Sequence, residues 1–271
     1  MRPAQQQVQP IEEIDPRVHI NGTIYHLRMQ QTAEVAGRFA LEAAALGEGV
    51  VCAVFRRCFY ARFPGERYAC VGGISLGRGP LNALVAGFRL PAFGERIAIS
   101  TAAAARWEPP AHEQATLDAQ LLRNARVPDE GLGCLVVGQH NALCVHAQPA
   151  LEAIDGWLAG NSLGAQAEQL IGLGAGLTPS GDDYLGGVLV ALHALERAAQ
   201  ADSLWRWLEP RLAGRTGAIS GAHLAAAAAG QAHEALHAVL AGSSDLGELD
   251  ALGDCSGWDA LAGALAVLRT T

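Results

Sequence analysis

A glycine-rich loop that leads into a helix constrains this chain more than any other segment. Residues 171–187 read IGLGAGLTPSGDDYLGG, with glycines at 172, 174 and 176. Glycine lacks a Cβ and tolerates positive φ, so the N–H groups of such a loop can converge on a ligand. A helix that begins at Ser180 adds its N-terminal dipole at the same place. The segment predicts an anion-binding loop over 172–181 that uses five residues: Gly174, Gly176, Thr178, Ser180 and Gly181.

A second interpretation of the same residues needs no ligand. Ser180 and Asp183 have the spacing of a capping box, with serine as the N-cap and a carboxylate three positions later. A tight glycine turn followed by a cap accounts for the helix start, although a cap does not require the long glycine approach. We therefore expect the cap and keep the ligand site open beside it.

The helix-start pattern returns near the C-terminus. SGDDYLGGVL at 180–189 aligns with SGWDALAGAL at 256–265, which indicates an internal repeat. Leu and Gly recur at positions that suit close contact between helices. We expect the two helices to pack as neighbours, with their N-termini facing one shared cleft.

The repeat also separates the acidic residues of the two helix starts. Asp183 and Asp259 share the position that a cap explains, whereas Trp258 is the counterpart of Asp182. Asp182 is therefore the first candidate for chemistry, as a catalytic carboxylate or as a ligand of Mg²⁺. Asp183 is a further catalytic candidate, and we assign Asp259 and Ser256 to the same binding site.

Two other clusters contain residues that can bind an anion. Arg78 and Asn82 belong to a second glycine-rich turn, in which the arginine can clamp a carboxylate or phosphate and the asparagine can bind an amide. The alternative is an ordinary tight turn. His223 follows Ser220, which we expect to cap a helix, and it can donate to an anion or transfer a proton. A single histidine is more often merely packed.

Residues 233–237 read HEALH, which matches the HExxH pattern of zinc-dependent hydrolases. In a helix the two histidines lie on one face, and the glutamate can act as a base beside the metal. A zinc site needs a third ligand, and none of the acidic residues downstream belongs to a recognisable ligand motif. We expect a helix surface with two polar positions and no zinc, with the hydrolase as the alternative.

Charge and composition exclude several functional classes. The net charge is −8, which disfavours nucleic acid and anionic membranes as partners. All 19 cationic residues are arginine, so a P-loop lysine, a Schiff-base lysine and covalent attachment of PLP are excluded. The six cysteines form no CxxC pair and no apolar leader begins the chain, so we expect reduced thiols in a cytoplasmic protein.

The pattern along the chain predicts an α+β fold, with a β-rich N-terminal lobe packed on a larger, mostly helical C-terminal lobe. We expect a polar arm at 1–16, the β-rich lobe at 17–125 and the helical lobe at 126–271. The first lobe should hold a hairpin at 17–29, a helix at 32–47, strands between 50 and 100, and a helix at 111–125. A buried strand at 132–138 should precede six helices: 148–159, 162–171, 180–199, 203–213, 219–241 and 256–269.

Three segments together resemble one bacterial protein family. GLGAGLTPSGDD, the run TGAISGAHLAAAAAGQAHEALH at 216–237, and GDCSGWDALAG at 253–263 are similar to the AllH-like family of oxamate carbamoyltransferase subunits, long classed as of unknown function. The resemblance covers most of the chain after about residue 50. This chain departs from the family pattern at Ala175, where we expect proline, and at Asp254-Cys255, where we expect His-Ser.

The resemblance implies a subunit of a carbamoyltransferase that acts in allantoin degradation, a branch of purine catabolism. It would transfer a carbamoyl group between an oxalurate- or oxamate-like acid and phosphate, so its expected ligands are phosphate or carbamoyl phosphate and an oxamate-like acid. Other enzyme subunits are the expected protein partners. Mg²⁺ is a possible cofactor, and a non-catalytic structural subunit stays open as an alternative function.

Overall fold

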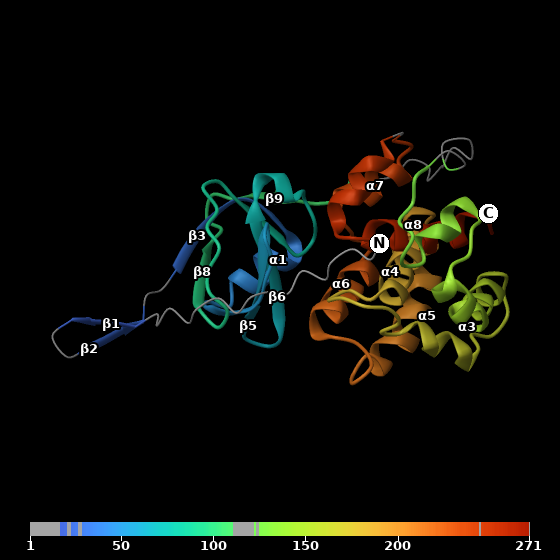
Figure 1. Ribbon diagram of the computed structural model, residues 1–271, viewed down its shortest axis with the longest axis horizontal. Coiled ribbons are helices and arrows are strands. Elements are labelled where there is room, and N and C mark those ends of the chain that lie inside the picture. Colours follow the sequence, from blue (N-terminus) through green and yellow to red (C-terminus); the bar gives the residue numbers. More distant parts are fainter. Residues whose placement is uncertain are drawn as a thin grey trace, which may run out of the picture.

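The computed structural model describes residues 17–20, 23–26, 29–110, 122, 125–243 and 245–270. Figure 1 shows a β-barrel beside a mostly helical region, which confirms the predicted α+β fold. The arm predicted at 1–16 and nearly all of the helix predicted at 111–125 lie outside the described residues. The lobe boundary near residue 125 stays a prediction.

Strand β3 closes the barrel, because it pairs with β7 on one side and with β8 on the other. The β3–β8 and β6–β7 pairs are parallel and the other barrel pairs are antiparallel. Around the barrel the strands follow this order: β3 (Met29–Gly37), β7 (Asn82–Val85), β6 (Arg67–Gly73), β5 (Cys58–Phe63), β4 (Gly49–Val54) and β8 (Arg96–Ser100). Strand β9 (Ala105–Trp107) pairs in parallel with the C-terminal end of β3. Strands β1 (Arg17–Ile20) and β2 (Thr23–His26) form the predicted hairpin, which Figure 1 shows apart from the barrel.

The helix predicted at 32–47 is wrong over its first half. Residues 29–37 form β3, and only α1 (Arg38–Ala44) is helical. Gln31 and Ala33 are buried while their neighbours Gln30, Thr32 and Glu34 are exposed, and this alternation is typical of a strand with one face on a core. The abundance of alanine favoured a helix and concealed the period of two.

The helical region contains ten elements within the described residues: η2 (Gly133–Val137), α3 (Ala142–Leu158), η3 (Ala165–Leu170), α4 (Ser180–Ala194), α5 (Ala198–Leu208), η4 (Glu209–Arg211), α6 (Ala218–Ala228), α7 (Glu234–Leu240), η5 (Leu246–Leu252) and α8 (Ser256–Leu268). The buried strand predicted at 132–138 is wrong, because this segment forms the 3₁₀ helix η2. The single helix predicted at 219–241 is also wrong, since a turn at Gly230 separates α6 from α7. A short 3₁₀ helix in the barrel, η1 (Ile74–Leu76), follows β6.

Helices α4 and α8 pack against each other through reciprocal glycines. A Cβ on Gly187 would lie 1.8 Å from the carbonyl oxygen of Ala260, and a Cβ on Gly263 would lie 1.9 Å from that of Tyr184. Ala260 and Gly263 are the repeat counterparts of Tyr184 and Gly187, so the contact relates the two helices by an approximate two-fold rotation. The prediction that the repeated helices are neighbours is confirmed.

The crossing predicts opposite effects for two adjacent glycines. Gly187→Ala should lower the free energy of unfolding by about 3 kcal/mol, because the new methyl group overlaps backbone atoms of α8. Gly186→Ala is the control, since its Cβ would meet only the side chains of Ala227, at 3.7 Å, and Leu224, at 4.0 Å. It should be neutral or stabilising by up to about 1 kcal/mol through helix propensity. Urea unfolding of both variants checks this, and equal stabilities would contradict the crossing.

Candidate functional site

A cavity of about 1060 Å³ lies between the barrel and the helical region. Tyr60, Cys70 and Asn82 line it from the barrel, and the loop 174–178 lines it from the helical region. Figure 1 shows α6 and α7 on the side of the helical region that faces the barrel. Leu81 of the barrel packs with Ile219 of α6 in a small apolar cluster, so the two walls of the cavity are joined by a buried contact.

The glycine loop has the backbone conformation that its sequence predicts. Gly172, Gly174 and Gly176 all have positive φ, at 74°, 108° and 97°. A Cβ on Gly172 would lie 2.0 Å from the carbonyl oxygen of Arg215, so this glycine lets the loop approach the chain before α6. Gly174 and Gly176 line the cavity, and a Cβ on Gly176 would meet no atom within 4 Å. The loop therefore exposes its backbone to the cavity at the end nearest α4.

The two repeated helices begin beside each other at this cavity. The hydroxyl oxygens of Thr178 and Ser256 are 3.0 Å apart, and Ser180 Oγ lies 3.8 Å from Cys255 Sγ. Residues at both helix starts line the cavity, so the predicted shared cleft is confirmed. The predicted capping box is wrong: Pro179 is the N-cap of α4, and no side chain caps that helix. Ser180 is instead the first helical residue, and its hydroxyl points toward α8.

Asp182 braces the loop and α6 against α4. Its Oδ1 accepts the N–H of Gly172 at 2.8 Å, and its Oδ2 accepts the hydroxyls of Ser220, at 2.6 Å, and Thr216. The side chain is almost completely buried. These three donors occupy the carboxylate, which gives the leading candidate for chemistry a structural task that the repeat comparison missed. Ser220 correspondingly binds Asp182 and does not cap α6, which begins at Ala218.

Asp183, and not Asp182, has a carboxylate oxygen without a hydrogen-bond partner among the described residues. The residue lines the cavity and is partly accessible, but its Oδ2 is buried and has no hydrogen-bond partner. Burial raises the pKa of this carboxyl well above its usual range, while hydrogen bonding from Ser256 and Thr178 acts in the opposite direction. A ligand that donates to Oδ2 would supply the missing partner. Asp183 is therefore the carboxyl group of this cavity that is best placed for chemistry.

Asp259, the repeat counterpart of Asp183, is fully buried and does not line the cavity. Its Oδ1 accepts the N–H groups of Leu132 and Gly133, at 2.6 and 2.8 Å, and so caps the start of η2. Burial raises the pKa of Asp259, although these donors and Ser180 partly offset that effect. The structure thus separates Asp259 from the site to which we assigned it.

His223 meets the barrel through a tyrosine that the sequence did not single out. Its Nε2 lies 2.9 Å from the hydroxyl of Tyr60, and both residues line the cavity. Burial lowers the pKa of His223 to about 4, so its imidazole is neutral at neutral pH. The alternation in β5 contained the missing signal: Phe59 and Ala61 face the barrel core, so Tyr60 between them faces the helical region.

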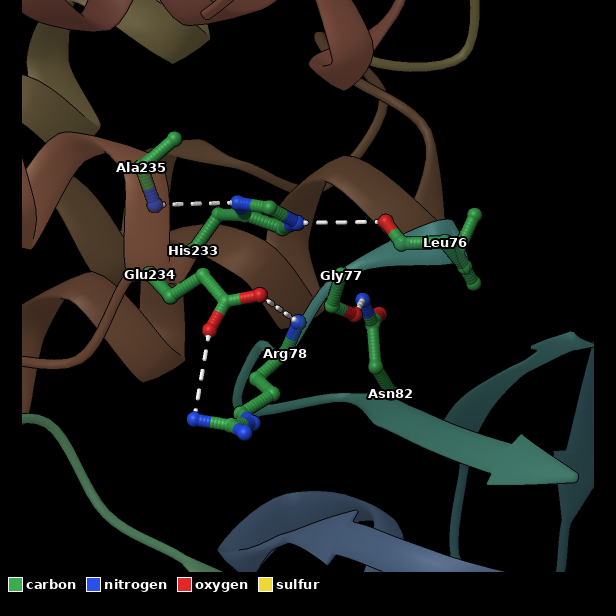
Figure 2. Close-up of polar contacts among 7 residues, drawn as sticks. All are labelled: Leu76, Gly77, Arg78, Asn82, His233, Glu234 and Ala235. Atoms are coloured by element: carbon green, nitrogen blue, oxygen red, sulfur yellow. Dashed lines mark hydrogen bonds and ion pairs between the residues drawn. The ribbon is translucent and has the colours of Figure 1, made fainter. Parts of the chain in front are cut away.

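Arg78 and Asn82 hold the barrel turn in place. Figure 2 shows Glu234 accepting the backbone N–H of Arg78 at 2.7 Å and facing its guanidinium at 3.7 Å. Asn82 Nδ2 donates to the carbonyl oxygen of Gly77 at 2.9 Å. Asn82 also lines the cavity, whereas Arg78 does not. The turn is thus a contact between β-barrel and α7.

The HEALH motif lacks the geometry of a zinc-binding helix, because His233 is the N-cap of α7. Its Nδ1 accepts the N–H of Ala235 at 3.2 Å and its Nε2 donates to the carbonyl oxygen of Leu76 at 3.3 Å (Figure 2). His237 is buried, and its Nε2 accepts the N–H of Ala232 at 3.0 Å. Across the described part of the chain, no three His, Cys, Asp or Glu residues gather in a way that could hold a metal ion.

The adjacent aspartates should respond differently to substitution. Asp182→Ala should lower the free energy of unfolding by about 3 kcal/mol or more, because it leaves buried donors without an acceptor. Asp183→Asn should stabilise the protein at pH 7, because the folded state raises the pKa of Asp183 and so loses stability as pH rises above the ordinary value of 3.8. The stability difference between wild type and Asp183→Asn should shrink toward pH 4. Denaturant unfolding across this pH range measures both effects, and a stable Asp182→Ala would contradict the brace.

The histidine motif gives a separate prediction. His237→Ala should lower the free energy of unfolding by about 1–3 kcal/mol, because the N–H of Ala232 loses its acceptor. His146→Ala, at an exposed position of α3, should have no effect. Metal analysis should find the same zinc content in wild type and both variants. Stoichiometric zinc that disappears in His237→Ala would restore the hydrolase alternative.

One comparison with known proteins finds a similar family for part of the helical region. Residues 170–268 match the family model described as oxamate carbamoyltransferase subunit AllH. The matched span contains the glycine loop, both helix starts and His223, and the barrel lies outside it. Neither the curated proteins nor the solved structures yield a match. No helix in the described ranges is long and apolar enough to cross a membrane. The resemblance seen in the sequence is thus confirmed over residues 170–268, which are similar to the AllH family.

Proposed function

We propose that this chain is a subunit of an oxamate carbamoyltransferase and that the cavity between barrel and helical region binds its small anionic substrate. The observation that carries the proposal is the coincidence of the family match with one wall of the cavity. The matched residues supply the loop 172–181, the two helix starts and His223. The substrates would be an oxalurate- or oxamate-like acid, with phosphate or carbamoyl phosphate as the second reactant.

The cavity contains cationic and dipolar groups that can bind an anion and a carboxyl group that can accept hydrogen bonds from an amide. Carbamoyl transfer requires donors for the oxygen that becomes negative in the transition state and a fixed position for the two reactants. The starts of α4 and α8 direct their positive dipole ends into the cavity, and Arg56 and Arg57 line it from the barrel. These cationic and dipolar groups suit a carboxylate or phosphate. Asp183 offers an acceptor for the amide N–H groups of the carbamoyl compound.

The cavity is lined by several acidic residues, whose carboxylate oxygens are the type of ligand that Mg²⁺ prefers. Asp182 cannot serve readily as the metal ligand that we expected, because its oxygens already accept three hydrogen bonds. The proposed reaction therefore does not depend on a metal held by Asp182. Six acidic residues line the cavity: Asp129, Glu130, Asp182, Asp183, Asp250 and Asp254.

The proposal includes an assembly with other subunits, as the family description implies. The barrel has no match in the family model, so it is the part of the chain whose task the family does not indicate. Because barrel residues form part of the cavity wall, we infer that the barrel completes the binding site. We propose that Tyr60 and the two arginines act together with residues of the matched region.

The proposed function predicts phosphate-dependent carbamoyl transfer by the assembly that contains this chain. Carbamoyl phosphate formed from oxalurate and phosphate can be measured directly. Asp183→Ala in that assembly should lower kcat/KM by about 100-fold or more, the usual scale for loss of a group that acts on the reacting centre. Asp202→Asn, at an exposed position of α5, is the matched control and should keep full activity.

Two results would contradict this function. The first is an intact assembly that transfers no carbamoyl group between these acids and phosphate in either direction. The second is an active assembly in which Asp183→Ala has the activity of wild type, which would indicate a structural subunit with the chemistry elsewhere.

A further inference from the structure

We propose that Tyr60, His223 and Asp183 form a binding site for a primary carbamoyl group, in which the Tyr60–His223 pair donates to its carbonyl oxygen and Asp183 accepts from its NH₂. This assignment rests on the proposed function and deepens it, because it names the part of the substrate that each of these residues holds. Tyr60 comes from β5, outside the matched region. The site would therefore exist only where barrel and helical region meet.

The Tyr60–His223 pair has one polar hydrogen to offer a ligand. The phenol carries one hydrogen and a neutral imidazole carries one, and their contact of 2.9 Å uses one of the two. If Tyr60 donates to Nε2, the Nδ1–H of His223 is left; if Nε2–H donates, the hydroxyl hydrogen of Tyr60 is left. Within the described residues, Nδ1 makes no hydrogen bond to the protein. The first arrangement leaves Nδ1–H of His223 as a neutral donor at the cavity; in the second, the thiol of Cys70 beside Tyr60 competes with a ligand for the hydroxyl hydrogen.

The charge state of the pair suits a carbonyl oxygen. Burial keeps His223 neutral and raises the pKa of Tyr60 well above its usual range, so both groups hold their protons at neutral pH. A neutral donor can stabilise the oxygen of a carbamoyl group as negative charge develops there, without attracting phosphate into the wrong position. The pair is also held rigidly, since Tyr60 is packed in the cluster that contains Ile219 and Ala226 of α6.

Asp183 supplies the complementary acceptor from the start of α4, on the same helical wall as His223. Its Oδ2 is buried and has no hydrogen-bond partner among the described residues, and an N–H donor would both satisfy it and lower the pKa that burial has raised. Asp183, Tyr60 and His223 all line this one cavity. Asp182, in the first turn of α4, accepts a hydrogen bond from Ser220 of α6 and so fixes the position of Asp183 relative to His223. Asp182 is thus a positioning residue for this site.

The shape of this arrangement selects a class of ligand. A carbamoyl or primary amide group presents a carbonyl acceptor beside an NH₂ donor, and the cavity presents a donor and an acceptor in return. The transferred carbamoyl group is that of oxalurate or carbamoyl phosphate, so oxamate serves here as a probe of the site. Its primary amide has the same donor and acceptor beside a carboxylate, whereas oxalate has a second carboxylate in place of the amide. The second carboxylate would bring an acceptor against Asp183, and two acceptors repel each other.

Calorimetric titration of the purified chain with oxamate and with oxalate tests the assignment. Wild type should bind oxamate at least about 10-fold more tightly than oxalate, because one extra hydrogen bond and one avoided repulsion favour the amide. Tyr60→Phe should weaken oxamate about 3- to 10-fold, which is the loss of one hydrogen bond. Asp183→Ala should remove the preference for oxamate over oxalate. Tyr68→Phe, which removes a hydroxyl that donates to Glu66 in the turn before β6, is the matched control and should bind like wild type.

The outcomes separate this inference from the proposed function. Equal binding of oxamate and oxalate by wild type, or a preference that survives in Asp183→Ala, overturns the site even if the assembly transfers carbamoyl groups. Unchanged oxamate affinity in Tyr60→Phe overturns the role of the pair. If the amide preference is present and is lost in the variants while the assembly has no transferase activity, the site stands and the proposed function fails. Asp183→Asn, which keeps the side-chain shape, serves as a second variant if Asp183→Ala unfolds.

Discussion

The crossing of α4 and α8 at two glycines is the contact on which the rest of the structure depends. Gly187 and Gly263 let each helix reach the backbone of the other, which larger side chains would prevent. This close approach brings Thr178 against Ser256 and sets two helix starts at one cavity. The repeat in the sequence corresponds to this approximate two-fold arrangement, and its two halves differ at the repeated aspartate: the first turn of α4 presents Asp183 to the cavity, whereas α8 lines the cavity with Ser256 and buries Asp259.

Neighbouring aspartates in one helix turn have opposite tasks because they point about 100° apart around the helix. Asp182 faces the loop and α6, where Gly172, Thr216 and Ser220 donate to it. Asp183 faces the cavity with an oxygen that no protein group satisfies. Asp182 therefore has a stabilising role, and the ligand-binding role is the one that we propose for Asp183.

The sequence predicted the elements whose signals are local and periodic. The α+β division, the start of α4 at Ser180, the pairing of the repeated helices and the positive φ of the glycine loop all followed from glycine spacing and helical pattern. It mispredicted η2, since a short apolar run fits a strand or a 3₁₀ turn equally well. It exchanged the tasks of Asp182 and Asp183, because the donors to Asp182 lie 34 and 38 residues away in the chain and no local pattern reveals them. The contact between Tyr60 and His223 spans 163 residues and was equally invisible.

The barrel and the helical region meet at the cavity, and the central claim is that a small carbamoyl compound binds there between them. A crystal structure of the chain with oxamate tests this most directly. The account predicts oxamate in the cavity, with its NH₂ within about 3.2 Å of Asp183 Oδ2 and its amide oxygen within about 3.2 Å of the Tyr60–His223 pair, the usual limit of such hydrogen bonds. Oxamate bound elsewhere on the chain, or a cavity closed by side chains when oxamate is present, would contradict it.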